Sequence, residues 1–193
     1  MIKDGIWAPE QDFTQIANSL YPTIRIKVQL VLPVIDTVAD RRPAELRDLA
    51  WDDPALLAAF DLYATEVLRR LDRIELASIS IGNEVDGHLS TSQDWAAYRI
   101  FFEHAKATVA WLRPGVPVGV NLTWSGLNGA SASEARMLAA MGDVWLVNHY
   151  SLQGGFHIGP PDAIANDMAA MLALAGDKPV YLSELGYPSD GCG

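Results

Sequence analysis

The sequence has a single cysteine, Cys192, among its 193 residues. One thiol can form neither an internal disulfide nor the cysteine cluster of a structural zinc site. Stability must therefore come from a hydrophobic core. A chain of this length, with 50% hydrophobic residues, can bury a substantial core within one domain.

Long hydrophobic runs are also lacking. No stretch approaches the roughly 18–20 apolar residues of a membrane-spanning helix, so we predict no membrane span. The opening residues, Met1 to Gly5, do not begin a secretory signal, because no apolar segment follows them. Localisation is left open, with a secreted or periplasmic full-length protein as one alternative.

Positive charge is scarce, with 14 basic against 24 acidic residues and a formal net charge of −10. A nucleic-acid partner requires a basic surface that neutralises phosphates, so we exclude that class. The glycine-rich pieces at 126–129 and 154–155 lack the spacing of a phosphate-binding loop, and no Gly-x-Ser-x-Gly motif is present.

The sequence does contain a repeating order of strand, turn and helix. Apolar and polar residues alternate in the first strand, and Asp53-Pro54 is typical of a helix N-cap followed by proline. The predicted strands are residues 24–32, 77–84, 116–124, 143–150 and 179–185. The predicted helices are residues 54–71, a long one that Thr91 or Ser92 caps, one to Met141 with a capping box from Ser131, and one after Pro161 that Gly176 ends.

Five strands with four intervening helices predict an α/β fold with a parallel sheet. A doubly wound sheet fits this pattern too, but it gathers its site at one switch point. Functional-type side chains here follow nearly every strand, which favours a (β/α)8 TIM barrel. These side chains are Asp36, Glu84, Asn121, Trp124, His149, Tyr150 and Glu184.

Five strands cannot close a barrel of eight. If Glu84 ends the fourth strand, strands three to seven are visible, and strands one, two and eight are missing. We therefore expect residues 1–193 to form one incomplete TIM-barrel domain, a fragment of a longer enzyme.

Glu84 and Glu184 each end a predicted strand and lie 100 positions apart. A barrel uses about 31 residues per strand–helix unit, so 100 positions correspond to about three units. Both glutamates then stand at the same rim. Paired carboxylates across a barrel mouth are the equipment of a retaining glycosidase.

In this interpretation Glu84 protonates the leaving oxygen, and Glu184 attacks the anomeric carbon to form a covalent glycosyl-enzyme. Asn83 can hydrogen-bond the sugar 2-hydroxyl. Regular alternation puts Glu184 on the same side as Val180 and Leu182. The structural alternatives are a Glu84 paired with an arginine and a Glu184 that satisfies a helix N-terminus.

The predicted strand before Glu184 ends in Asn148, His149 and Tyr150. A phenol beside the nucleophile could donate to its carboxylate and orient it, although Tyr150 could equally be a tyrosine at the edge of the core. Asn148 shares the face of Tyr150. His149 has the opposite parity, so we interpret it as a packing residue.

Two tryptophans are candidates for stacking on sugar rings. Trp124 follows the third strand, and Trp51 precedes the first predicted helix; core packing is the alternative for both. Trp95 and Trp111 recur at helical core spacing, so we interpret them as packing residues.

We predict no metal and no cofactor. Glu84, Asp86 and His88 alternate, but no further ligand set accompanies them. Asp36 and Asp40 are interpreted as loop anchors. Asn121 begins a formal glycosylation sequon, which we discount because it ends a strand.

The paired motifs resemble those of the clan A retaining glycoside hydrolases. The resemblance covers about residues 24–188 in strand order. The acid/base motif reads Ser80-Ile81-Gly82-Asn83-Glu84, similar to Gly-Asn-Glu in galactanase-like members. The nucleophile motif reads Leu182-Ser183-Glu184-Leu185-Gly186-Tyr187-Pro188.

The resemblance implies an Asn-Glu on strand four and a Glu on strand seven of a barrel, with Glu84 as acid/base and Glu184 as nucleophile. It implies Asn83 as a ligand of the 2-hydroxyl and Tyr150 as the aromatic of strand six. The arginine of strand two and the aromatic platform of strand eight, which the family usually has, are not visible.

We therefore predict hydrolysis of O-glycosidic bonds in a poly- or oligosaccharide by double displacement. The rival is a non-catalytic carbohydrate-binding or scaffold barrel, and a third alternative is another barrel hydrolase or lyase. The sugar, its linkage, endo or exo action and the oligomeric state are left open.

Overall fold

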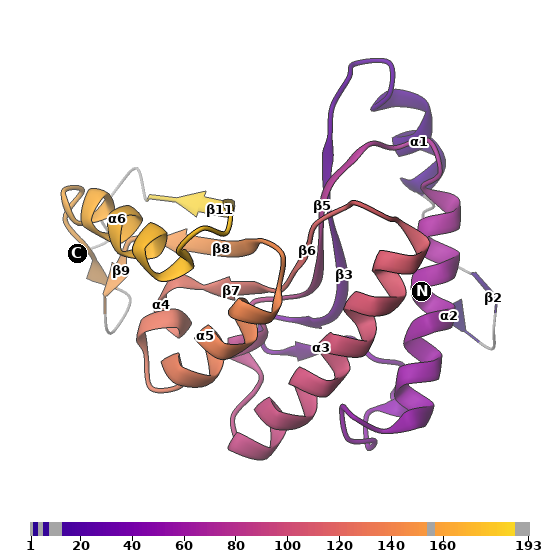
Figure 1. The fold of residues 1–193 in the computed structure, drawn as a ribbon, viewed down its shortest axis with the longest axis horizontal. Coiled ribbons are helices and arrows are strands. Elements are labelled where there is room, and N and C mark those ends of the chain that lie inside the picture. Colours follow the sequence, from indigo (N-terminus) through magenta and orange to yellow (C-terminus); the bar gives the residue numbers. More distant parts are fainter. Residues whose placement is uncertain (1, 4–5, 8–12, 154–156, 188–193) are drawn as a thin grey trace.

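The computed structural model describes residues 2–3, 6–7, 13–153 and 157–187, and it is an α/β structure (Figure 1). Cys192 and Pro188 lie outside the described residues. Within the described part, no helix is long and apolar enough to cross a membrane. The helices are α1 (Phe13–Leu20), α2 (Pro54–Arg70), α3 (Ser92–Leu112), α4 (Trp124–Asn128), α5 (Ala132–Met141) and α6 (Ala163–Ala175), with 3-10 turns η1 (Ala44–Leu46) and η2 (Val85–Gly87).

The strands form two main sheets that share one stretch of chain. One sheet has the order β4-β3-β5-β6 and the other β11-β8-β7, and only Val120 separates β6 from β7. The strands are β1 (Ile2–Lys3), β2 (Ile6–Trp7), β3 (Val28–Asp36), β4 (Ala39–Asp40), β5 (Leu76–Asn83), β6 (Val118–Gly119), β7 (Asn121–Thr123), β8 (Trp145–Tyr150), β9 (Leu152–Gln153), β10 (His157–Ile158) and β11 (Val180–Gly186).

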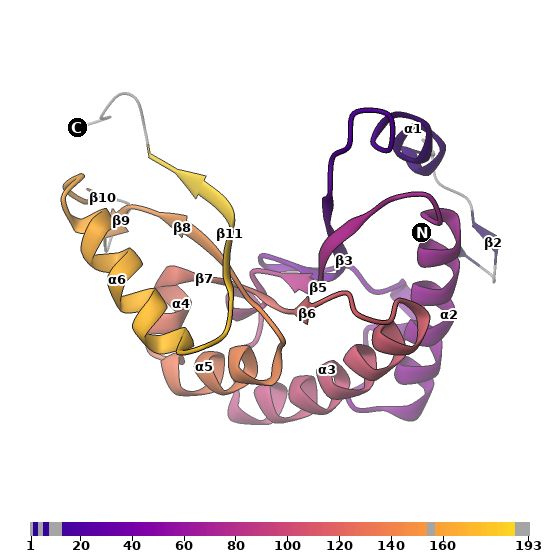
Figure 2. The ribbon, with the colours of Figure 1, turned by 45° about the horizontal axis from the view of Figure 1, so that its top comes forward.

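Five parallel strand positions therefore follow one another in sequence order: β3, β5, β6/β7, β8 and β11. This order has no reversal, whereas a doubly wound sheet is defined by one. Helices α2, α3, α5 and α6 lie in an arc on the outer side of the strands (Figure 2). β3 and β11 do not pair with each other, so the described residues do not form a closed barrel.

Local sequence signals set the starts of the two long helices. Asp53 accepts a hydrogen bond from the Ala55 amide at 2.8 Å, and Pro54 occupies the first helical position of α2. Thr91 and Asp94 form a reciprocal capping box at the start of α3. The predicted caps, Asp53 and Thr91, are confirmed because a cap depends only on residues within one turn.

An aromatic cluster packs α2 and α3 against the outer face of the sheet. The rings of Trp51 and Tyr98 lie 5.1 Å apart, and those of Phe60 and Phe101 lie 5.2 Å apart, both edge to face. Such pairs contribute about 0.5–1.5 kcal/mol each beyond burial of their area. The Tyr98 hydroxyl donates to the Ile81 carbonyl at 2.9 Å, which fixes α3 to the carboxyl end of β5.

Three details of the predicted elements are wrong. β3 begins at Val28 because residues 21–25 form a turn in which Arg25 is left-handed, with φ 54°. Ser131 makes no side-chain cap on α5. The third predicted strand is interrupted at Val120, where its pairing passes from one sheet to the other, and its last predicted residue, Trp124, begins α4 instead.

Candidate active site

Glu84 and Glu184 stand at the same end of the parallel sheet. Glu84 follows the last residue of β5, and Glu184 lies near the end of β11. Asn148 of β8 connects them: it is the register partner of Glu184, and its Nδ2 donates to Glu84 Oε1 at 2.9 Å. The structure therefore brings the two glutamates together through one shared neighbour.

An irregularity in β11 determines the face on which Glu184 lies. Leu182 pairs with Val147 and Glu184 pairs with Asn148, so Ser183 is an extra residue in the ladder. Neighbouring residues of β8 point to opposite faces, and therefore Leu182 and Glu184 do too. The expectation that Glu184 shares the side of Leu182 is wrong, because this bulge shifts the alternation by one residue.

Glu84 is held in a left-handed backbone conformation, with φ 47° and ψ 48°. For a residue with a side chain this conformation costs about 1–2 kcal/mol. Thr37 Oγ1 donates to Oε2 at 2.8 Å, and Asn148 donates to Oε1. Each carboxylate oxygen thus has one neutral donor, in place of the arginine that the structural alternative required.

The contact of Thr37 with Glu84 was not predicted from the sequence. Thr37 is also left-handed, with φ 57°, and its amide donates to the Asn83 carbonyl at 2.9 Å. A Cβ at Gly87 would lie 2.9 Å from the Thr37 carbonyl oxygen. The turns after β3 and β5 are therefore tightly packed, and no sequence pattern around Thr37 indicates this contact.

Tyr150 makes the predicted contact with Glu184. Its hydroxyl donates to Glu184 Oε2 at 2.7 Å, and the residue is 44% exposed. The hydrogen bond to Glu184, some burial, and the negative charges of Glu184 and Glu84 raise the pKa of the Tyr150 phenol. The phenol therefore remains a donor to higher pH than an ordinary tyrosine.

A row of amides joins Glu84 to the next strand ends. Asn121 Nδ2 donates to Asn83 Oδ1 and to Asn148 Oδ1, each at 2.9 Å. Asn83 Nδ2 donates to Asp36 Oδ1 at 3.2 Å. Hydrogen bonds from Arg41, and then from Asn83, hold the pKa of Asp36 below its ordinary value.

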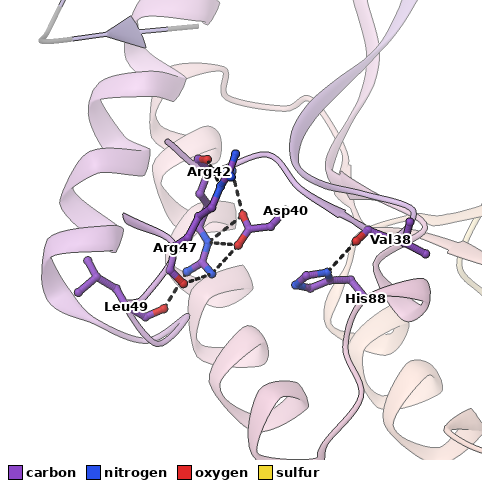
Figure 3. A network of polar contacts seen from close by, with 6 residues as sticks. All are labelled: Val38, Asp40, Arg42, Arg47, Leu49 and His88. Carbon is purple, nitrogen blue, oxygen red and sulfur yellow. Dashed lines mark hydrogen bonds and ion pairs between the residues drawn. The ribbon is translucent and has the colours of Figure 1, made fainter. Parts of the chain in front are cut away.

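Asp86 comes two residues after Glu84 and binds the end of β7. Thr123 donates to it twice, from its amide at 2.9 Å and from its hydroxyl at 2.5 Å. Burial raises the pKa of Asp86 against these two hydrogen bonds. His88 instead contacts the Val38 carbonyl, with Nδ1 at 3.2 Å (Figure 3). Glu84, Asp86 and His88 thus each engage a different partner.

The tryptophans occupy different environments. Trp51 is 5% exposed, and the Arg42 guanidinium lies 4.0 Å from its ring centroid. Asp40 and the carbonyls of Arg47 and Leu49 hold that guanidinium (Figure 3). This placement favours a packing role for Trp51, because its ring is already covered.

Trp124 is the first residue of α4 and is half-buried at the sheet end that carries the glutamates. Trp95 is in the core, as predicted, whereas Trp111 is 79% exposed, so the packing role predicted for Trp111 is wrong. His149 is buried on the outer face, where Nε2 lies 2.9 Å from Asp167 Oδ2 of α6, as its parity predicts.

Comparison with known proteins indicates the fold. No protein-family model matches the sequence, and no curated protein is significantly similar to it. Among solved structures, the Ignisphaera aggregans GH53 catalytic domain aligns with a TM-score of 0.68 and 15% identity, over 94% of this chain and 52% of that domain.

Two β-glucuronidases resemble the chain as well. The Bacteroides uniformis β-glucuronidase aligns with a TM-score of 0.65 and 12% identity, over 96% of this chain and 20% of that one. A β-glucuronidase from an uncultured Clostridium sp. aligns with a TM-score of 0.62 and 18% identity, over 96% of this chain and 29% of that one. The chain thus has a fold found in glycoside hydrolases, and it spans about half or less of each of these proteins.

Proposed function

We propose that this chain carries the catalytic pair of a retaining glycoside hydrolase, which cleaves O-glycosidic bonds in a poly- or oligosaccharide. The observation that carries the proposal is the position of Asn148, whose backbone pairs with Glu184 while its side chain binds Glu84. Two carboxyl groups that share one small neighbour suit the short separation, about 5–5.5 Å, that retention requires.

The proposed roles follow from the hydrogen bonds. Glu184, ionised and oriented by Tyr150, attacks the anomeric carbon, while Glu84 gives its proton to the departing oxygen. A glycosyl ester on Glu184 results. Glu84 then removes a proton from water, which attacks the same carbon and releases the sugar and the Glu184 carboxylate. Asn83 and Trp124, both half-buried, line the same end of the sheet and are proposed to contact the sugar, whereas Asn148, predicted as a sugar ligand, is 1% exposed and binds Glu84 and Asn121 instead.

We further propose that the five parallel strands are strands three to seven of one (β/α)8 barrel. Their sequential order and outer helices support this, as do the outer edge of β11, which no described strand pairs with, and the outer edge of β3, which pairs only at Ile35 and Asp36 with the short strand β4. Leu185 of β11 is 60% exposed, although apolar residues of a barrel strand normally pack beneath a helix. Three more strand–helix units would cover these edges, and activity is expected of the completed barrel.

A mechanism-based label tests the catalytic pair. The full-length protein is incubated with a panel of 2-deoxy-2-fluoro glycosides that carry an activated leaving group, and peptides are analysed by mass spectrometry. We expect one fluoroglycosyl group on Glu184. Glu184→Gln is the matched variant and should remain unlabelled. Glycan binding by the same protein without labelling or hydrolysis would instead support the non-catalytic carbohydrate-binding barrel.

A further inference from the structure

Three asparagines form a chain of hydrogen bonds between two carboxylates. Asn83 Nδ2 donates to Asp36 at one end, and Asn148 Nδ2 donates to Glu84 Oε1 at the other. The oxygens of both amides point inward to Asn121, which donates to each of them. Both N–H groups of Asn121 are therefore in use.

The two carboxylates determine the direction of every bond in this chain. An ionised carboxylate only accepts, so Asn83 and Asn148 must each turn an NH2 group toward it. Their oxygens then face Asn121, which must donate twice without adding charge. Asn121 is 1% exposed, and within the described structure its Oδ1 is buried without a hydrogen-bond partner. The site retains this unsatisfied acceptor because, with the Asn121 amide reversed, its oxygen would face the side-chain oxygens of Asn83 and Asn148.

Building on the proposed role of Glu84, we propose that Asn121 is a positioning residue that confines the acid proton of Glu84 to Oε2. Asn148 cannot turn its oxygen toward Glu84 without turning its NH2 group onto the NH2 group of Asn121. An N–H donor therefore stays on Oε1 whether Glu84 is ionised or protonated, and Oε1 remains an acceptor.

Oε2 has a different kind of neighbour. Thr37 Oγ1 lies 2.8 Å away, and a hydroxyl can donate to an ionised oxygen or accept from a protonated one. Oε2 can thus gain and lose a proton without any movement of the asparagines. A departing sugar oxygen would have to approach Oε2 beside the Thr37 hydroxyl, which can donate to that oxygen as its proton leaves.

Nuclear magnetic resonance tests this polarity in the unaltered chain. With asparagine labelled in its side-chain nitrogen, the Asn148 amide resonance should shift in one transition with pH and remain hydrogen-bonded at both ends of it. Glu84→Gln should abolish the transition. An Asn148 amide that becomes unbonded when Glu84 is protonated would overturn the proposal. This readout requires no catalysis. The resonance test can therefore fail while labelling of Glu184 succeeds, and it can succeed while labelling fails.

Asn121→Asp in the full-length protein supplies the kinetic test. A carboxylate at 121 accepts from both flanking amides, so the oxygen of Asn148 turns to Glu84 and favours its protonated form. The alkaline limb of kcat/KM should then move to higher pH. Asn166→Asp, the same change on the exposed face of α6, should leave that limb in place.

Asn121→Ala removes both donors without adding a charge, and it serves if the aspartate variant does not fold. It should lower kcat about tenfold with little change in KM, because two hydrogen bonds that orient the site are lost. It should also allow the Asn148 amide to turn and lose its hydrogen bond to Oε1 when Glu84 is protonated, which changes the Asn148 resonance. A purely structural role would instead reduce the yield of folded protein and leave kcat, the pH profile and the Asn148 resonance unchanged.

Discussion

The ring of Tyr150 occupies the space that a side chain at position 186 would need. A Cβ on Gly186 would lie 2.3 Å from Cε1 of Tyr150, and the two residues are register partners in β8 and β11. The ring crosses β11 over this glycine, and its hydroxyl reaches Glu184. Gly186 is therefore what allows the phenol to reach the proposed nucleophile.

Gly186→Ala should displace the Tyr150 ring and break its hydrogen bond to Glu184. We expect a loss of about 1–3 kcal/mol of unfolding free energy from overpacking, measured by denaturant unfolding. Loss of a hydrogen bond to a charged group, worth about 1.5–3 kcal/mol, should lower kcat about 10- to 100-fold.

Gly119→Ala is the control for overpacking alone. A Cβ there would lie 2.5 Å from the carbonyl oxygen of Val144, the residue before β8. It should destabilise the protein and leave kcat of the folded fraction intact. Equal losses of kcat in the two variants would contradict the specific role of Gly186.

The Tyr150–Glu184 contact should be visible in an alkaline titration. The pKa of Tyr150 is raised chiefly by its hydrogen bond to Glu184, so Glu184→Gln should lower it toward the ordinary value. Tyrosinate absorbance, with Tyr150→Phe subtracted, isolates this one phenol. Burial raises the pKa of Tyr63 to about 12, and that value should not respond to the substitution.

The same contact links stability to pH. The pKa of the Tyr150 phenol is higher in the folded than in the unfolded chain. The contribution of the contact to the unfolding free energy is therefore complete below the unfolded pKa. It is lost as pH rises through the folded value. The unfolding free energy should therefore fall more steeply in alkali for the unaltered chain than for Glu184→Gln. Identical slopes would indicate that the two side chains are not bonded in solution.

Thr37→Val tests the contribution of the Thr37 hydroxyl while it keeps the shape of the side chain. The variant keeps the β-branch but cannot donate to Glu84 Oε2, so kcat should fall about tenfold while KM changes little. The contact is exposed, and the unfolding free energy should fall by no more than about 1 kcal/mol. Thr37→Ser retains the hydroxyl and should stay close to the parent in steady-state kinetics and in denaturant unfolding.

The order of the five parallel strands and of helices α2, α3, α5 and α6 was predictable because its signals are local, whereas α1 and α4 were not predicted. Asp53-Pro54 and the Thr91 cap each act within one helical turn, and Gly176 ends α6 with φ 63°. Periodicity likewise identified the strands. Ile24 was wrongly assigned to the first strand because an apolar residue in a turn can continue the alternating pattern of a strand.

The site was predictable only in part. Glu84, Glu184 and Tyr150 were named because each ends a strand, and parallel strands end at one edge. The bulge at Ser183 was not predicted, because it is defined by pairing with β8, which lies at a distance in the sequence. Thr37 was missed for a similar reason: its contact with Glu84 joins turns 47 positions apart.

Asp86 provides a pH test with a defined sign. Burial raises its folded pKa above the unfolded value, so the native state holds a proton more tightly than the unfolded chain. Stability is therefore higher below the ordinary pKa of an aspartate and falls as pH rises to the raised folded value. Asp86→Asn removes the titrating group, so this fall in unfolding free energy with rising pH should disappear.

Asp36 is the matched comparison because its pKa is shifted the other way. Arg41 and Asn83 lower it, so Asp36 contributes stability above the ordinary pKa that is lost as pH falls to the lowered folded value. Asp36→Asn should therefore remove a rise in stability with pH where Asp86→Asn removes a fall. Denaturant unfolding across acidic to neutral pH measures both slopes. If Asp86→Asn leaves the slope unchanged, the carboxyl ionises as it would in water, and its burial beneath Thr123 is contradicted.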